Sequence, residues 1–128
     1  MTALGTGRAD NGFSAMRVIV SLVLLLAGCS RGTNADLPSI GEARSLAAEW
    51  ALVNRQAAQG HLTATYTETA RAELRTQLRT TARSLSQSDS SYGEEIRSLL
   101  ALPDDASADA LKGHADRLKQ IEDGLESA

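Results

Sequence analysis

The clearest structural pattern lies in residues 39–60, which read SIGEARSLAAEWALVNRQAAQG. Apolar residues recur there every three or four positions, the spacing that places side chains on one face of an α-helix. The residues of this face are Ile40, Ala43, Leu46, Ala47, Trp50, Val53, Asn54 and Ala57. Ser39 and Glu42 have the spacing of a capping box, and Gly60 suits the left-handed conformation that ends a helix. The pattern therefore predicts a helix from Ser39 to about Gln59.

A second helix is predicted from residue 62 or 65 to residue 85. Its apolar stripe consists of Tyr66, Ala70, Leu74, Leu78 and Leu85. Thr65 and Glu68 form a candidate capping box at its start. Threonines alternate at positions 63, 65, 67 and 69, which is a strand-like pattern, because β-branched side chains lose rotamer freedom in a helix. Helix remains the expectation, since the sequence offers no partner strand.

The C-terminal part predicts a short helix and a longer one. The short helix begins at a capping box formed by Ser91 and Glu94 and ends before Pro103. The longer helix is capped by Asp105 or Ser107. Its Leu111, Leu118 and Leu125 repeat every seven residues, with His114 and Ile121 between them. This spacing is typical of a packing seam between helices.

An apolar run precedes all four predicted helices. Residues 18–26 read VIVSLVLLL, follow Arg17, and are followed at once by small residues, an order typical of a signal peptide. Counted to Ala27, the run would extend about 15 Å as a helix, half the hydrocarbon thickness of a bilayer. It is therefore too short to be a membrane span.

Leu26-Ala27-Gly28-Cys29 closes this run and resembles the lipobox of bacterial lipoproteins. The resemblance covers only the signal and Cys29. It implies cleavage before Cys29, a diacylglyceryl group on the cysteine sulfur and acylation of the new amine. In Gram-negative members of this class, a serine at the position of Ser30 favours the outer membrane over the inner one. The resemblance thus implies a protein anchored to a membrane of the cell envelope and facing the periplasm.

Two other interpretations of this segment stay open. Cys29 could be incidental to an ordinary cleaved signal peptide, or the apolar N-terminus could stay uncleaved. Met16 stands directly before Arg17 and could itself begin a shorter signal peptide.

The predicted fold class is all-α, a small antiparallel bundle of three to four helices. The predicted organisation is a signal peptide in residues 1–28, a lipidated flexible tether in residues 29–38 and a helical domain in residues 39–128. Only 3% of the residues are aromatic, so we expect a core made mostly of Leu and Ala.

Charge and cysteine content exclude several classes of function. Removing residues 1–28 takes Arg8, Arg17 and Asp10 from a chain of net charge −3 and leaves −4, which disfavours nucleic acid as a partner. The single cysteine rules out an internal disulfide bond and a metal site of paired thiolates. The sequence indicates no cofactor other than the covalent lipid, and no particular oligomeric state.

A basic ridge is the one patterned surface feature. Arg71, Arg75, Arg79 and Arg83 recur every fourth residue and fall along one side of the second helix. The ridge could be a solvated face, or it could pair with the acidic fourth helix lying beside it. It is also a candidate partner surface for phospholipid headgroups, an anionic cell-wall polymer or an acidic protein.

Catalytic and metal-binding patterns are weak. His61 and His114 are the only near-neutral acid–base groups, and both are expected to be structural, His61 exposed and His114 at the edge of the core. Asp104, Asp105 and Asp109 lack the spacing of a calcium loop. We therefore expect no enzyme.

The sequence favours a non-catalytic adaptor or structural partner in the cell envelope, held to the membrane by its lipid. The alternative is a periplasmic binding module that holds an apolar ligand or a peptide between its helices. Trp50 and Tyr66 would then be the natural lining of the pocket.

Overall fold

The computed structural model describes residues 34–128. Over this range the chain forms four helices and no strand. The helices are α2 (Leu37–Ala58), α3 (Ala64–Arg83), α4 (Ser91–Leu100) and α5 (Ala108–Glu126). The prediction of an all-α fold with three long helices and one short helix is confirmed. The predicted signal peptide and Cys29 lie outside the described residues.

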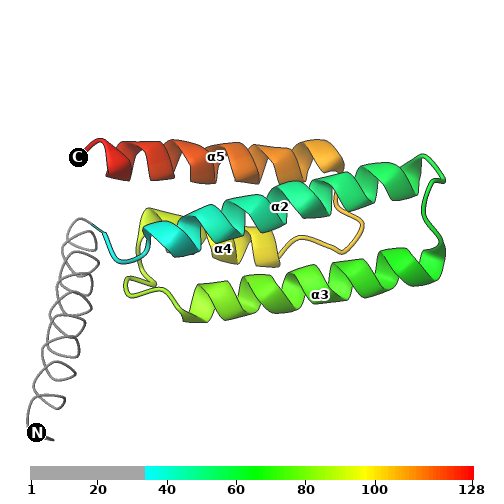
Figure 1. Ribbon diagram of the computed structural model, residues 1–128, viewed down its shortest axis with the longest axis horizontal. Helices are drawn as coiled ribbons and strands as arrows, with labels where there is room; N and C mark the ends of the chain where they lie inside the picture. The colour runs from blue at the N-terminus through cyan, green and yellow to red at the C-terminus, as the bar shows by residue number, and fades with distance from the viewer. Residues whose placement is uncertain (1–33) are drawn as a thin grey trace, which may run out of the picture. The chain divides into compact units, whose positions relative to one another are not determined.

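α2 is the central helix of the bundle (Figure 1). It packs most extensively against α5 and next against α3, while α4 contacts α3 and α5. Within the described range α3 and α5 make no contact, so the predicted pairing of the basic second helix with the acidic fourth helix is wrong. An acid of α5 instead faces α2, where Glu122 Oε2 lies 3.0 Å from Arg44 Nε.

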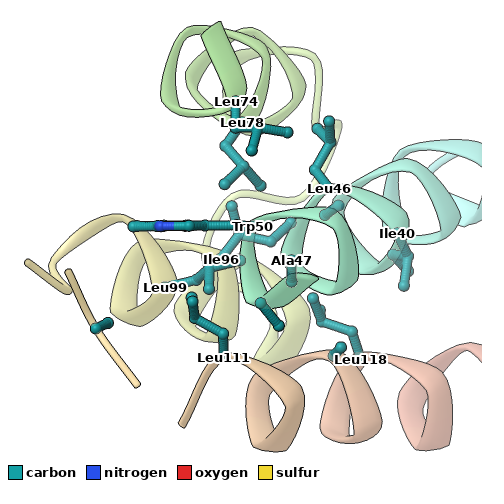
Figure 2. Packing of buried hydrophobic residues seen from close by; sticks show 14 of the residues in the cluster. Ile40, Leu46, Ala47, Trp50, Leu74, Leu78, Ile96, Leu99, Leu111 and Leu118 are labelled. Carbon is teal, nitrogen blue, oxygen red and sulfur yellow. The ribbon is translucent and has the colours of Figure 1, made fainter. Parts of the chain in front are cut away.

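The core gathers the apolar faces of all four helices. Trp50 and Ile40 of α2 are fully buried, and Trp50 lies between leucines of α3 on one side and side chains of α4 and α5 on the other (Figure 2). The larger of these side chains are Leu74, Leu78, Ile96, Leu99, Leu111 and Leu118. None of the four helices described has both the length and the apolar character needed to cross a bilayer.

α2 begins three residues earlier than the sequence predicted, because its N-cap is Asp36 and not Ser39. Its first residue is Leu37, Pro38 lies in the first turn, and Ser39 is inside the helix rather than at its cap. Proline is tolerated there because the first N–H groups of a helix have no intrahelical acceptor. The last residues assigned to the tether, from Asp36 onward, therefore belong to the folded body.

The other helix starts follow hydroxyl caps that differ in part from the predicted ones. Thr63 caps α3 and Ser90 caps α4, so the predicted caps Thr65 and Ser91 are wrong. Ser107, one of two predicted caps, does cap α5 and accepts a hydrogen bond from the backbone N–H of Ala110 at 3.1 Å. At the end of α2, Gly60 has φ +74°, as its predicted role as a helix stop requires.

The threonine-rich start of α3 is helical despite its strand-like alternation. The hydroxyl of Thr67 donates to the carbonyl of Thr63 at 2.8 Å, a bond made within the helix itself. Thr67 also occupies the buried position at this end of α3, where the sequence had predicted Tyr66. Tyr66 is instead 58% exposed, so its assignment to the apolar stripe is wrong.

Candidate functional site

The four arginines of the basic ridge all lie on α3 but divide into two pairs. Arg71 and Arg75 are half-buried, whereas Arg79 and Arg83 are exposed. The division follows from the loop between α4 and α5, which contacts α3 near its middle, at Arg75. The predicted four-residue surface is therefore only partly available to a partner.

Arg75 holds the loop between α4 and α5. Its Nη1 donates to the carbonyl of Leu100 at 2.9 Å, and its other nitrogens bond to the carbonyl of Leu102 and the carboxylate of Asp104. The guanidinium carbon also lies 4.8 Å from the centre of the Trp50 ring, within the range of a cation–π contact. Because all of these contacts are internal, Arg75 is a structural residue.

Arg71 is held in place through Asn54 of α2. Its Nε donates to Asn54 Oδ1 at 2.8 Å, while neither terminal nitrogen of Arg71 has a hydrogen-bond partner among residues 34–128. Asn54 is only 6% exposed and donates through Nδ2 to the carbonyls of Asp104 at 3.0 Å and Ala106 at 2.7 Å. Trp50 Nε1 donates to the Asp104 carbonyl as well, at 3.0 Å. We call Trp50, Asn54, Arg75 and loop residues 101–107 the Asn54 end of the bundle.

Two hollows open beside these arginines. The larger has a volume of about 550 Å³ and lies between the end of α2 and the start of α5. The smaller, of about 270 Å³, lies along α3 and is lined by Arg71, Arg75 and Arg79. Arg71 lines both hollows, so its side chain is common to the two.

The two aromatic residues expected to line an apolar pocket differ in their surroundings. Trp50 is completely buried in the core and Tyr66 is exposed. Neither residue lines either of the two hollows.

Asp36 is a buried residue that the helical periodicity of the sequence does not indicate. It is 2% exposed and accepts hydrogen bonds from the backbone N–H of Ser86 at 2.7 Å, the backbone N–H of Gln87 at 3.0 Å and the hydroxyl of Tyr92 at 2.8 Å. Acidic residues favour helix N-termini, and Asp36 directly before Leu37-Pro38 is the signal that would have indicated a helix start here. We call Asp36, loop residues 84–90 and Tyr92 the Asp36 end of the bundle.

The electrostatics of the Asp36 end shift two pKa values. Burial by itself would raise the pKa of Asp36, but the hydrogen bonds from Ser86, Tyr92 and Gln87 together outweigh burial and lower it. Burial raises the pKa of Tyr92, and its hydrogen bond to Asp36 raises it further. The structure thus favours an ionised Asp36 bonded to a neutral Tyr92.

The two histidines have the exposure that the sequence predicted. His61 is exposed, and its Nδ1 is 2.8 Å from the side-chain oxygen of Gln56. His114 is half-buried between α4 and α5, with Nδ1 2.5 Å from Glu95 Oε1, an oxygen that also lies 3.0 Å from Arg117 Nε. The Glu95 cluster therefore joins α5 to α4. In the part of the chain that the structure describes, no three His, Cys, Asp or Glu side chains are placed to hold a metal ion.

Comparison with known proteins adds no assignment. No protein-family model, curated protein or solved structure matches this chain. Its function must therefore be argued from its own residues.

Proposed function

We propose that this chain is a lipid-anchored protein of the cell envelope whose helical body acts as a non-catalytic adaptor. The observation that carries the proposal is the sequence Leu26-Ala27-Gly28-Cys29 directly after a short apolar run. A thiolate is the strongest common nucleophile among side chains, which suits the cysteine to accept a lipid. Two or three acyl chains then hold a protein stably at a membrane, where one chain holds only marginally.

The start of the folded body gives the proposal a definite geometry. Asp36 is buried, and it follows Cys29 by only seven positions. At about 3.3 to 3.6 Å per residue, this link reaches at most about 25 Å. A lipid on Cys29 would keep the N-terminal end of α2 close to the membrane surface.

A non-catalytic role is supported by the use that the chain makes of its polar groups. Polar side chains of the folded body form hydrogen bonds with backbone groups of the loops. Examples are Asp36, Asn54 and Arg75. The Glu95 and His114 side chains bond across the α4–α5 interface. Side chains bonded in this way stabilise the fold. Contacts with other molecules would then be made by residues at the surface.

Mass spectrometry of the chain purified from membranes tests the lipid anchor. We expect the N-terminal peptide to begin at residue 29 and to carry a diacylglyceryl group and an amide-linked acyl chain. The Cys29→Ser variant should lose the lipid and be retained uncleaved or released, whereas Ser30→Ala is a matched control that should keep it. An unmodified residue 29 still joined to Gly28 would contradict the proposal.

Fractionation of the envelope tests the sorting of the anchored protein. Because serine at position 30 favours the outer membrane and aspartate favours retention at the inner membrane in Gram-negative lipoproteins, Ser30→Asp should move the protein from the outer to the inner membrane fraction. The same distribution for both forms would contradict sorting by residue 30.

A further inference from the structure

The larger hollow is a groove with small side chains and basic edges. Alanines from both neighbouring helices and the preceding loop contribute to it, and Arg55 and Arg71 lie at its edges together with Asp105. The alanines are Ala57, Ala58, Ala106 and Ala108. Since alanine has no side chain beyond Cβ, the backbone of a bound segment could approach α2 and α5 closely.

The groove and the adjoining smaller hollow carry an excess of positive charge. Arg75 and Asp104 form an ion pair and neutralise each other. Of the remaining charged residues, the basic ones are Arg55, Arg71 and Arg79, and the acidic ones are Glu68 and Asp105. Within residues 34–128, none of these three arginines forms an ion pair, whereas the chain as a whole has a net charge of −3.

We propose that this groove binds an extended acidic segment of a protein partner, with glutamate or aspartate side chains pairing with Arg71 and Arg55. Guanidinium groups bind carboxylates through two parallel hydrogen bonds, and Arg71 still has both terminal nitrogens available in the described part of the chain. That the partner is a protein of the cell envelope rests on the proposed function. The pairing of its carboxylates with Arg71 and Arg55 does not depend on that function.

The shape of the groove favours a peptide over a phosphorylated headgroup. Its volume of about 550 Å³ is within the usual range of roughly 300–1,000 Å³ for binding pockets and accommodates a few extended residues. The carbonyls of Ala58 and Gln59 at the end of α2 and the N–H group of Ala108 at the start of α5 line the groove and have no backbone partner in the described part of the chain. An extended peptide has partners for both kinds of group, whereas a phosphate has only acceptors.

The location of the groove also favours a protein partner over the membrane lipid. It lies at the end of the bundle opposite Asn34, where the described chain begins (Figure 1). Asn54, the first residue of α2 to line it, is 17 residues after Leu37, or about 25 Å along the helix axis. A bundle linked to lipid at its Asp36 end can therefore present this groove away from the bilayer.

Peptide binding to the purified full chain in detergent micelles tests the proposal. The probes are acetylated pentapeptides with alanine and glutamate in every order, and the control set has glutamine in place of glutamate. Chemical shifts of the arginine Nε–H groups report which guanidinium is contacted. We expect at least one glutamate peptide to shift Arg55 and Arg71 and to bind at least about tenfold more tightly than its glutamine counterpart, the effect of one charged hydrogen bond.

Matched variants separate the groove from general attraction by positive charge. Arg55→Gln and Arg83→Gln change the net charge equally, but Arg83 lines neither hollow. We expect Arg55→Gln to weaken binding about tenfold and Arg83→Gln to leave it within about twofold. Ala58→Trp should abolish binding by filling the groove without changing the charge, and both Arg55 and Ala58 are exposed, so these variants should fold.

Three results would overturn the proposal. The first is that no glutamate peptide binds, and the second is that Arg55→Gln and Arg83→Gln weaken binding equally. The third is that short-chain phosphatidylglycerol shifts Arg55 and Arg71 while the peptides do not, which would make the groove a lipid site. An unmodified Cys29 would contradict the proposed anchor and leave this binding result unchanged, so the two failures are distinguishable.

Discussion

The two ends of α2 hold neighbouring loops by opposite kinds of hydrogen bond. At the Asp36 end, a carboxylate accepts bonds from the backbone N–H groups of Ser86 and Gln87 in the loop between α3 and α4. At the Asn54 end, the side chains of Trp50 and Asn54 donate to carbonyls of the loop between α4 and α5. One loop thus presents its donors to the core and the other presents its acceptors.

The difference has an electrostatic consequence. The Asp36 end depends on an ionised acid, and one of its three donors is the titratable hydroxyl of Tyr92. At the Asn54 end, the indole of Trp50 and the amide of Asn54 donate to the loop, and neither group titrates in the ordinary pH range. A fall in pH should therefore weaken the Asp36 end by protonating the Asp36 carboxylate that holds the loop.

Replacing the central side chain at the Asp36 end should have the largest effect on stability. In Asp36→Ala, three donors that are buried or partly buried lose their partner, each at a cost of roughly 1–3 kcal/mol, so we expect a loss of about 3–5 kcal/mol. Urea unfolding of the full chain followed by helical circular dichroism measures it. Asp89→Ala, an exposed acid of the same loop, should change stability by less than about 0.5 kcal/mol. Similar losses for both variants would mean that Asp36 is not the residue that holds this loop.

The corresponding change at the Asn54 end should cost less. Asn54→Ala removes two donated bonds and the bond from Arg71, but the Asp104 carbonyl keeps Trp50 as a donor. We expect a loss of about 2 kcal/mol in the same urea experiment. A loss larger than that of Asp36→Ala would reverse the ranking of the two ends.

Acid should remove the contribution of Asp36 and leave that of Asn54. Because the pKa of Asp36 in the folded chain lies below its ordinary value of 3.8, its stabilising effect is fully present above that value and is lost as the pH falls through the lower, folded pKa. The difference in unfolding free energy between wild type and Asp36→Asn should thus be constant from neutral pH to about pH 5 and shrink below pH 4. The difference between wild type and Asn54→Ala should not shrink, and parallel behaviour of the two differences would contradict this assignment.

The sequence could predict the helices but not these two loop attachments. Apolar periodicity is local, so it located α2, α3, α4 and α5 to within a few residues. Asp36 and Ser86 are 50 positions apart, and Asn54 and Ala106 are 52 apart, so their bonds depend on where two loops fall after the helices pack. An aspartate two residues before a proline and an asparagine on an apolar helix face carry no local sign of such a distant partner.

For the basic ridge, too, the sequence could predict the helix positions of the arginines but not their contacts. Its spacing on α3 was predictable, because every fourth residue of a helix lies on one side. That Arg75 would be covered by residues 100–104, and that Arg71 would be fixed by Asn54, depended on the path of the loop between α4 and α5. Arg55 of α2 was missed as a candidate binding residue for the same reason, since it adjoins Arg71 only in the folded bundle.

The hydroxyl caps provide the smallest and most controlled comparison of the two ends. Ser90 caps α4 at the Asp36 end and Ser107 caps α5 at the Asn54 end, each accepting a bond from a backbone N–H three residues ahead. Ser90→Ala and Ser107→Ala should each cost about 1 kcal/mol, and both costs should stay the same between pH 7 and pH 3, because a serine hydroxyl does not titrate there. Ser91→Ala is the matched control, since Ser91 is exposed inside α4, and it should change stability by less than about 0.5 kcal/mol. If Ser90→Ala lost its effect in acid while Ser107→Ala kept it, protonation of Asp36 would already have released the loop that carries Ser90, and the two ends would differ in cooperativity as well as in charge.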